Sequence, residues 1–137
     1  MDPAQAAIVA AEALQLALNA ANHPTAQWIL SPHAGAAVEV RWSGVVAGSV
    51  STVRVDRVFR AGLTPESDGE QAWWIVDYKT VHAAAPDPAA ALPALRTLFA
   101  PQLETYAGFL RNLHGSDAVI RAGLYYPRML LFDWWEI

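Results

Sequence analysis

The stretch WWIVDYKT at residues 73–80 constrains the fold most, because it joins an apolar run to two charged residues at a fixed spacing. The aromatic and β-branched side chains of residues 73–76 suit a strand that is covered on both faces. Asp77 and Lys79 follow at positions i and i+2, and side chains alternate between faces along a strand. The spacing predicts a carboxylate and an ammonium group side by side at a strand's end. Two interpretations are open: a functional site, or a surface ion pair that closes a buried strand.

The composition indicates one folded domain. Hydrophobic residues make up 54% of the 137 residues and charged residues 16%, which argues against disorder. Because no apolar run approaches the roughly 20 residues that span a bilayer and no secretory signal is present, we expect a soluble, cytoplasmic protein without a membrane partner. The absence of cysteine excludes disulfides, thiolate zinc sites and iron–sulfur clusters. A net charge of −4 disfavours nonspecific nucleic-acid binding, although eight of the nine basic residues are arginines that can gather on one surface.

The first half of the chain reads as a helix followed by strands. Asp2 and Pro3 form a helix start, and the helix is expected to run to about residue 21. Residues 28–30 suggest a short helical turn, and alternating apolar residues at 38–42 predict a half-buried strand. Ser43-Gly44 is read as a turn, followed by a β segment over residues 45–59 that bends near Gly48, and then by an acidic loop over residues 61–71.

The second half adds a helix and two strands. Pro101 is expected to open a helix that ends near Gly115, and residues 119–126 and 130–137 are expected to form strands. Helices and strands in this order predict an α/β domain with helices packed on a central mixed sheet.

Two predicted strands each carry an aspartate near their end, Asp56 in VRVDRVF and Asp77 in WWIVDYKT. If these strands are neighbours, both carboxylates meet at one end of the sheet with Lys79 beside them. Hard oxygen ligands of this kind suit Mg²⁺ or Mn²⁺, and a lysine there can orient a water or stabilise charge during phosphodiester hydrolysis. The alternative is two unrelated strand-end aspartates.

Gln102 and Tyr106 stand at i and i+4 on the later helix and share one helical face. Taken in order, Asp, then Asp-x-Lys-Thr, then Gln-x-x-x-Tyr resembles the RecB-like nuclease branch of the PD-(D/E)XK superfamily, as found at the C-terminus of AddA-type helicase–nucleases. The form IVDYKT is typical of the catalytic strand in that branch. The resemblance covers the chain from about Glu39 to its end.

The resemblance implies a role for each matching position. Asp56 and Asp77 would be metal ligands and Lys79 the catalytic lysine. The accessory motif beside the active site and DNA would be Gln102 and Tyr106, and Glu39 matches an acidic position that is a further candidate metal ligand. The family further implies a restriction-endonuclease-like central mixed sheet flanked by helices, a Mg²⁺ or Mn²⁺ cofactor, and DNA as substrate during double-strand break repair. Helicase domains and a partner subunit would be its protein partners.

The chain also departs from the family pattern. Val53 stands where members usually have a glycine, and the first helix lacks the metal-binding histidine expected upstream. The four histidines at 23, 33, 82 and 114 have no ligand spacing. We therefore expect residues 1–137 to be a single nuclease-like domain, a fragment of a longer helicase–nuclease without the histidine helix; no Gly-x-x-x-x-Gly-Lys phosphate loop is present. Two functions stay open: a metal-dependent DNA exo- or endonuclease, or an inactive nuclease-fold module that binds or guides single-stranded DNA.

Overall fold

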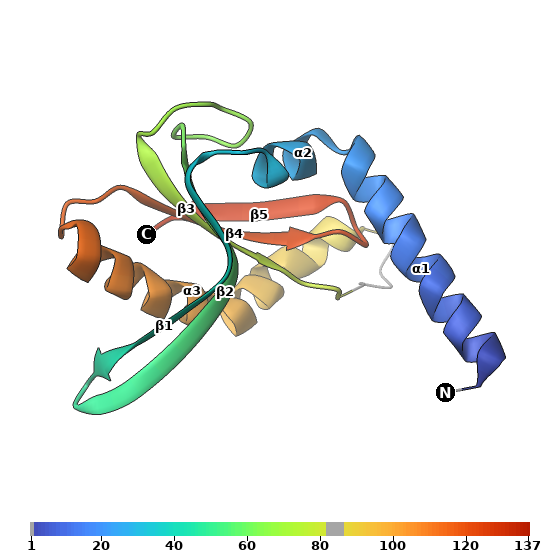
Figure 1. Cartoon of the computed structure of the whole chain (residues 1–137), viewed down its shortest axis with the longest axis horizontal. Helices are drawn as coiled ribbons and strands as arrows, with labels where there is room; N and C mark the ends of the chain where they lie inside the picture. Colours follow the sequence, from blue (N-terminus) through green and yellow to red (C-terminus); the bar gives the residue numbers. More distant parts are fainter. Residues whose placement is uncertain (1, 82–86) are drawn as a thin grey trace.

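A computed structural model describes residues 2–81 and 87–137 and contains one five-stranded sheet with helices on its faces (Figure 1). This architecture confirms the predicted mixed α/β class. The elements in chain order are α1 (Pro3–Asn22), α2 (Pro24–Leu30), β1 (Ala34–Val46), β2 (Ser49–Ala61), β3 (Ala72–Tyr78), the 3₁₀ helix η1 (Pro88–Ala91), α3 (Leu92–His114), β4 (Ile120–Tyr126) and β5 (Leu131–Glu136).

The strands lie in the sheet in the same order as in the chain. β1, β2 and β3 pair antiparallel, β3 and β4 pair parallel, and β5 returns antiparallel to β4. A parallel pair needs a long crossover connection, and α3 supplies it. The central strand β3 is therefore covered on both faces, as its apolar sequence predicts.

Two hydrophobic cores lie on opposite faces of the sheet. The core on the α3 face joins the helix residues Leu103, Tyr106, Ala107 and Leu110 to Val55, Val58, Ile75, Ile120, Ala122, Leu124 and Tyr126 of the strands. The core on the α2 face joins Ala26, Trp28 and Ile29 to Phe59, Ala61, Ala72, Trp74, Val76 and Tyr125. Alternation along β3 sends Ile75 to α3 and Trp74 to α2, so this strand contributes to both cores.

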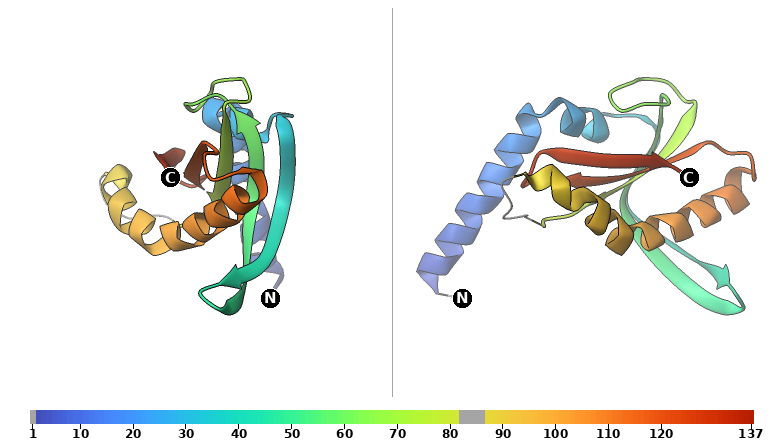
Figure 2. Two further views of the ribbon diagram at one scale, coloured as in Figure 1. Left: turned by 90° about the vertical axis from the view of Figure 1, so that its left-hand side faces the viewer. Right: turned by 180° about the vertical axis from the view of Figure 1, so that it is seen from behind.

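The expected start of the second helix at Pro101 is wrong, because α3 begins at Leu92 and contains Pro101. Pro93 occupies the first turn, where a missing N–H costs nothing. Leu95 and Phe99 pack against the α3-side core, so the apolar face continues across Pro101. A proline inside a helix removes one hydrogen bond and bends the helix, and Figure 2 shows α3 bending near its middle.

The expected turn at Ser43-Gly44 is also wrong. β1 continues to Val46, and the hairpin turns at Ala47-Gly48, which have φ of 51° and 82°. Two left-handed residues in succession match the twist of a tight hairpin. Gly44 is needed for packing instead, since a Cβ there would lie 2.8 Å from the Phe109 ring.

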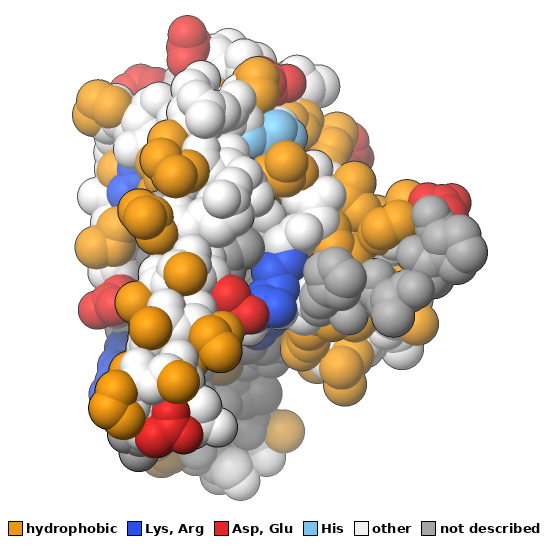
Figure 3. Space-filling model, turned by 90° about the vertical axis from the view of Figure 1, so that its right-hand side faces the viewer, with side chains coloured by type: hydrophobic (Ala, Val, Ile, Leu, Met, Phe, Trp, Pro, Cys, Tyr) orange, Lys and Arg blue, Asp and Glu red, His pale blue; other side chains and the backbone are white. Residues whose placement is uncertain are grey.

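α1 confirms the predicted first helix and its cap, because Asp2 Oδ1 accepts a hydrogen bond of 2.8 Å from the Gln5 amide. The helix extends away from the sheet (Figure 1), and hydrophobic side chains lie along the face seen in Figure 3. Large exposed apolar residues on α1 are Ile8, Val9, Leu14 and Leu18. Across the described ranges 2–81 and 87–137, no helix has the length and apolar character needed to cross a bilayer.

Candidate active site

The carboxylates of Asp56 and Asp77 lie where β2 and β3 separate. The last paired residues of these strands are Arg57 and Val76. Beyond them, the Asp56 amide donates to Asp77 Oδ1 at 2.9 Å, and the Tyr78 amide donates to Asp56 Oδ2 at 2.8 Å. Each carboxylate thus replaces a backbone carbonyl of the neighbouring strand, and the two side chains are fixed in one gap, as their sequence positions predict.

The path of β2 explains why Asp56 reaches this gap. Val55 and Val58 both pack in the α3-side core although they are three residues apart, whereas strict alternation would place them on opposite faces. β2 therefore departs from regular alternation between these two valines. On the other face, Arg57 donates to the carbonyl of Ile29 at 2.9 Å and to that of Ser31 at 2.7 Å. This buried arginine anchors β2 to the end of α2.

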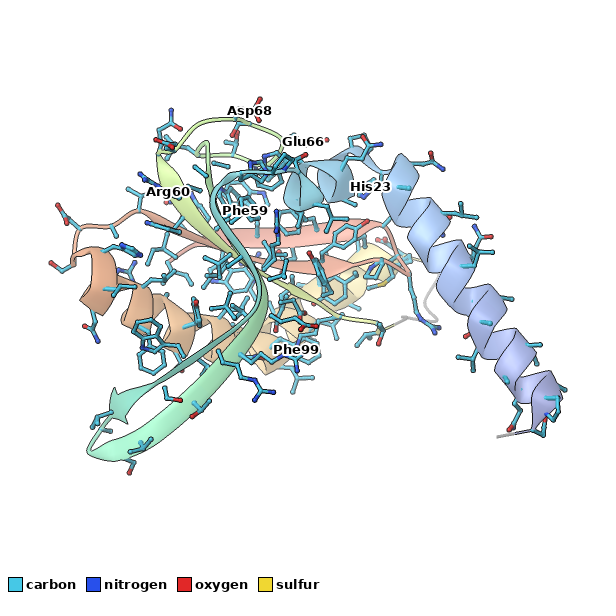
Figure 4. All side chains as sticks on the ribbon, viewed as in Figure 1. His23, Phe59, Arg60, Glu66, Asp68 and Phe99 are labelled. Carbon is cyan, nitrogen blue, oxygen red and sulfur yellow. The ribbon has the colours of Figure 1, made fainter. Side chains whose placement is uncertain are left out.

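Lys79 lies on the same side as Asp77, in agreement with the i, i+2 spacing. Its Nζ is 3.2 Å from Asp77 Oδ2 and 4.5 Å from the centre of the Phe99 ring, which Figure 4 labels on α3. The Lys79 amide donates to the Tyr125 carbonyl at 2.9 Å, so the backbone here is still held by β4. A carboxylate and an aromatic face together orient the ammonium group.

Phe99 lies upstream of the helix start that Pro101 predicts, so the sequence motifs do not identify it as a site residue. The signal that identifies it is the helical period of Leu95, Phe99 and Leu103, which continues upstream of Pro101.

Burial raises the pKa of the Asp77 carboxyl above its ordinary value of 3.8. The charge of Asp56 adds to this rise, while the Asp56 amide and the Lys79 ammonium oppose it, and burial prevails. Burial also raises the pKa of the Tyr78 hydroxyl to about 12, so this group stays protonated at neutral pH. Ionisation of Asp77 next to the Asp56 carboxylate is therefore unfavourable unless a further cation binds between them.

We expect the stability of the metal-free protein to reflect this shift. An acid whose pKa is raised on folding binds its proton more tightly in the folded chain, so the free energy of unfolding falls as pH rises from about 4 through the raised pKa. Asp77→Asn should remove this fall, and urea unfolding between pH 4 and 7 in a chelator measures it. The exposed Asp68→Asn is the matched control, and parallel curves for wild type and Asp77→Asn would contradict the expectation.

Gln102 lies beside the carboxylates but does not touch them. Its Nε2 donates to the backbone carbonyl of Arg54, two residues before Asp56 on β2. The Arg54 guanidinium lies 3.9 Å from Asp56 Oδ1. Gln102 therefore fastens α3 to the strand that carries Asp56.

Tyr106 departs from the expectation that it faces the carboxylates. It is buried in the α3-side core, where it lines an apolar cleft with Val40 and Trp42 of β1. Burial alone raises the pKa of its hydroxyl, whereas the charges of Asp56 and Asp77 both act on Tyr78. Tyr106 stands three residues after Leu103 and four before Leu110, so it shares the buried face of α3 with them.

Glu39 lies across from Asp56 in the register of β1 and β2, because its neighbours Val38 and Val40 pair with Arg57 and Val55. Its side chain is exposed, and its φ of 50° is a left-handed conformation that few non-glycine residues adopt. The residue is positioned near the separation of the strands, and its role as a metal ligand stays a prediction.

The donor set of the gap suits a hard cation. Asp77 Oδ2 and Asp56 Oδ1 are not engaged by the backbone amides that hold the other two carboxylate oxygens. They are the oxygens that would hold Mg²⁺ or Mn²⁺, with waters completing the coordination shell. In the part of the chain that the structure describes, no group of three or more His, Asp or Glu side chains is placed to hold a metal.

The described histidines lie elsewhere. His23 Nδ1 is 2.8 Å from the Tyr125 hydroxyl, His33 bonds the Trp28 carbonyl, and His114 stacks on Trp73 with ring centres 4.5 Å apart. His82 lies outside the described residues. A comparison with protein-family models and with curated proteins found no match for this chain.

Proposed function

We propose that this chain is a metal-dependent DNA nuclease domain with a restriction-endonuclease-like fold, related to the RecB-like nucleases of helicase–nucleases that act in double-strand break repair. The observation that carries the proposal is the pair of cross-strand hydrogen bonds that fix the Asp56 and Asp77 carboxylates, together with Lys79 on the same side. Two carboxylates and a lysine at one sheet end form a unit that supports phosphodiester hydrolysis. DNA, helicase domains and a partner subunit are the partners that follow from this proposal.

Each residue has a distinct task in this chemistry. Asp56 Oδ1 and Asp77 Oδ2 would hold Mg²⁺ or Mn²⁺, which polarises a phosphate and lowers the pKa of a bound water. Lys79 orients that water or stabilises the charge that develops on the phosphate. Phe99 limits the movement of the lysine, and Gln102 holds α3 against the strand of Asp56.

The second candidate function is an inactive nuclease-fold module that binds or guides single-stranded DNA. It is favoured by the small number of charged ligands, since only two carboxylates meet in the gap within the described ranges. Retention of Lys79 beside Asp77 favours the enzyme.

A cleavage assay on linear single- and double-stranded DNA, with Mg²⁺, Mn²⁺ or a chelator, tests the proposal. Loss of an outer-shell partner alone weakens metal binding by about 10–100-fold, so a site that lacks a direct ligand should hold Mg²⁺ weakly. We therefore expect slow cleavage with Mg²⁺, faster cleavage with Mn²⁺ and none with chelator. Asp56→Asn and Asp77→Asn should each abolish the metal-dependent product, whereas Asp68→Asn should leave it unchanged. Cleavage that persists in chelator, or in Asp77→Asn, would reject the proposal.

A further inference from the structure

A cleft runs along the α3 face between β1 and the C-terminal half of α3, and its wall extends past the register of Asp56, because Val40 and Trp42 pair with Val55 and Val53. We call it the β1–α3 cleft; it consists of two adjoining hollows that share Trp73 and His114. One hollow, of about 200 Å³, is lined mainly by aromatic and aliphatic side chains that include Trp42 and Tyr106. The other, of about 450 Å³, is polar and contains Arg60.

The aromatic side chains provide stacking surfaces. Trp42 and Phe109 have ring centres 6.1 Å apart, and Trp73 stacks on His114 at 4.5 Å. Trp42 and Trp73 are only partly buried, so solvent reaches both indoles. Aromatic rings of this kind bind nucleobases with little dependence on sequence, because every base has a π face.

Arg60 supplies a positive charge to the polar hollow, and no carboxylate of the described residues lies within ion-pair distance of it. Its guanidinium donates to the Glu70 carbonyl at 2.8 Å and lies 5.4 Å from the Trp73 ring centre. Its Nε is buried and has no hydrogen-bond partner among residues 2–81 and 87–137, and no ion pair joins Arg60 to an acid in those ranges. Figure 4 shows Arg60 at the end of β2, away from Phe99. A partly desolvated, unpaired guanidinium favours an anionic ligand, and phosphate suits its geometry.

The polar hollow also limits how much negative charge it can take. Glu70 and Asp117 line it together with Arg60. Their carboxylates repel additional phosphates but accept hydrogen bonds from the exocyclic amino groups of bases. The hollow is therefore suited to one phosphate beside Arg60 with a base next to it.

A short DNA strand can span the distance from the carboxylates to Arg60. Arg60 stands four positions after Asp56 on β2, which corresponds to about 13 Å along an extended strand. At a rise of about 3.4 Å per nucleotide, a DNA strand covers this distance in roughly four nucleotides.

We infer that the β1–α3 cleft binds an unpaired DNA strand, with bases against Trp42 and Trp73 and one phosphate on Arg60. This inference deepens the proposed nuclease function by assigning the path of the strand next to the carboxylates. Binding at the cleft requires neither the metal nor Lys79.

Fluorescence anisotropy with a labelled 12-nucleotide single strand, in chelator, tests the inference on the full chain. Arg60→Gln should weaken binding by about tenfold and reduce the salt slope of log K by about 0.7, the value for one phosphate contact on a single strand. Trp42→Ala should weaken binding by about tenfold as well. Arg60→Lys should retain most of the affinity and the full slope, and Arg128→Gln, which loses the same charge elsewhere, should bind like wild type.

The outcomes separate the two proposals. Binding that depends on Arg60 and Trp42 supports the cleft even if the protein cuts no DNA. Cleavage by wild type together with unchanged binding by Arg60→Gln and Trp42→Ala, both shown to be folded by circular dichroism, would overturn the cleft and leave the nuclease proposal intact. Failure of wild type to bind the strand, with self-association or peptide binding through the cleft instead, would also overturn it.

Discussion

Lys79→Ala is expected to lower the rate of DNA cleavage by about 10²–10³-fold, the usual cost of removing one group that stabilises charge in a transition state. The lysine is the only one in the chain, and within residues 2–81 and 87–137 no arginine forms an ion pair with Asp77. Its Nζ is held between Asp77 Oδ2 and the Phe99 ring, so the positive charge keeps one position in the site. The alanine variant should still bind metal, because both carboxylates remain.

Single-turnover gel assays at saturating Mn²⁺ measure this effect, because they separate the chemical step from metal affinity. Lys79→Met keeps the length of the side chain without its charge and should be as slow as Lys79→Ala, whereas Lys79→Arg should recover part of the rate. A purely structural role would instead lower the melting temperature of Lys79→Met and leave its rate near that of wild type. That result would remove the lysine from the mechanism.

The local features of the site could be predicted from the sequence because they depend on short-range geometry. The alternation of a strand places Asp77 and Lys79 on one side, and the apolar run before them predicts burial on both faces. The meeting of Asp56 with Asp77 depends on β2 and β3 being neighbours, which consecutive strands often are. It depends also on the departure of β2 from regular alternation between Val55 and Val58, which the sequence does not indicate.

The features that were missed depend on tertiary packing. Pro101 reads as a helix start, yet the packing of Leu95 and Phe99 offsets the loss of one hydrogen bond and extends α3 upstream. Ser43-Gly44 predicts a turn, yet Gly44 lies within the strand, where a Cβ would come within 2.8 Å of the Phe109 ring. Tyr106 has helical spacing both to Gln102 and to the buried Leu103 and Leu110, and spacing alone does not decide whether it faces the site or the core.

Trp74→Ala is expected to have the largest effect on stability. The side chain is fully buried, its Nε1 donates to the Gly62 carbonyl at 2.9 Å, and its ring centre lies 4.9 Å from that of Trp28 and 5.5 Å from that of Trp134. Truncating a buried tryptophan costs about 3–5 kcal/mol through lost burial and the cavity that remains. This is a large part of the roughly 5–15 kcal/mol that keeps a domain folded, and the melting temperature should fall by about 10–20 °C.

Thermal and urea unfolding measure the change, with Leu98→Ala as the control for truncation of an exposed apolar side chain. Trp74→Phe should cost less than Trp74→Ala, because it retains most of the buried ring and loses mainly the hydrogen bond to Gly62. Since Trp74 packs toward α2 whereas Lys79 lies over Phe99 of α3, Trp74→Ala that is kept folded at low temperature should retain metal-dependent cleavage. Loss of cleavage in the folded variant would show that the α2-side core also positions the carboxylates, and a melting temperature close to that of wild type would contradict the burial argument itself.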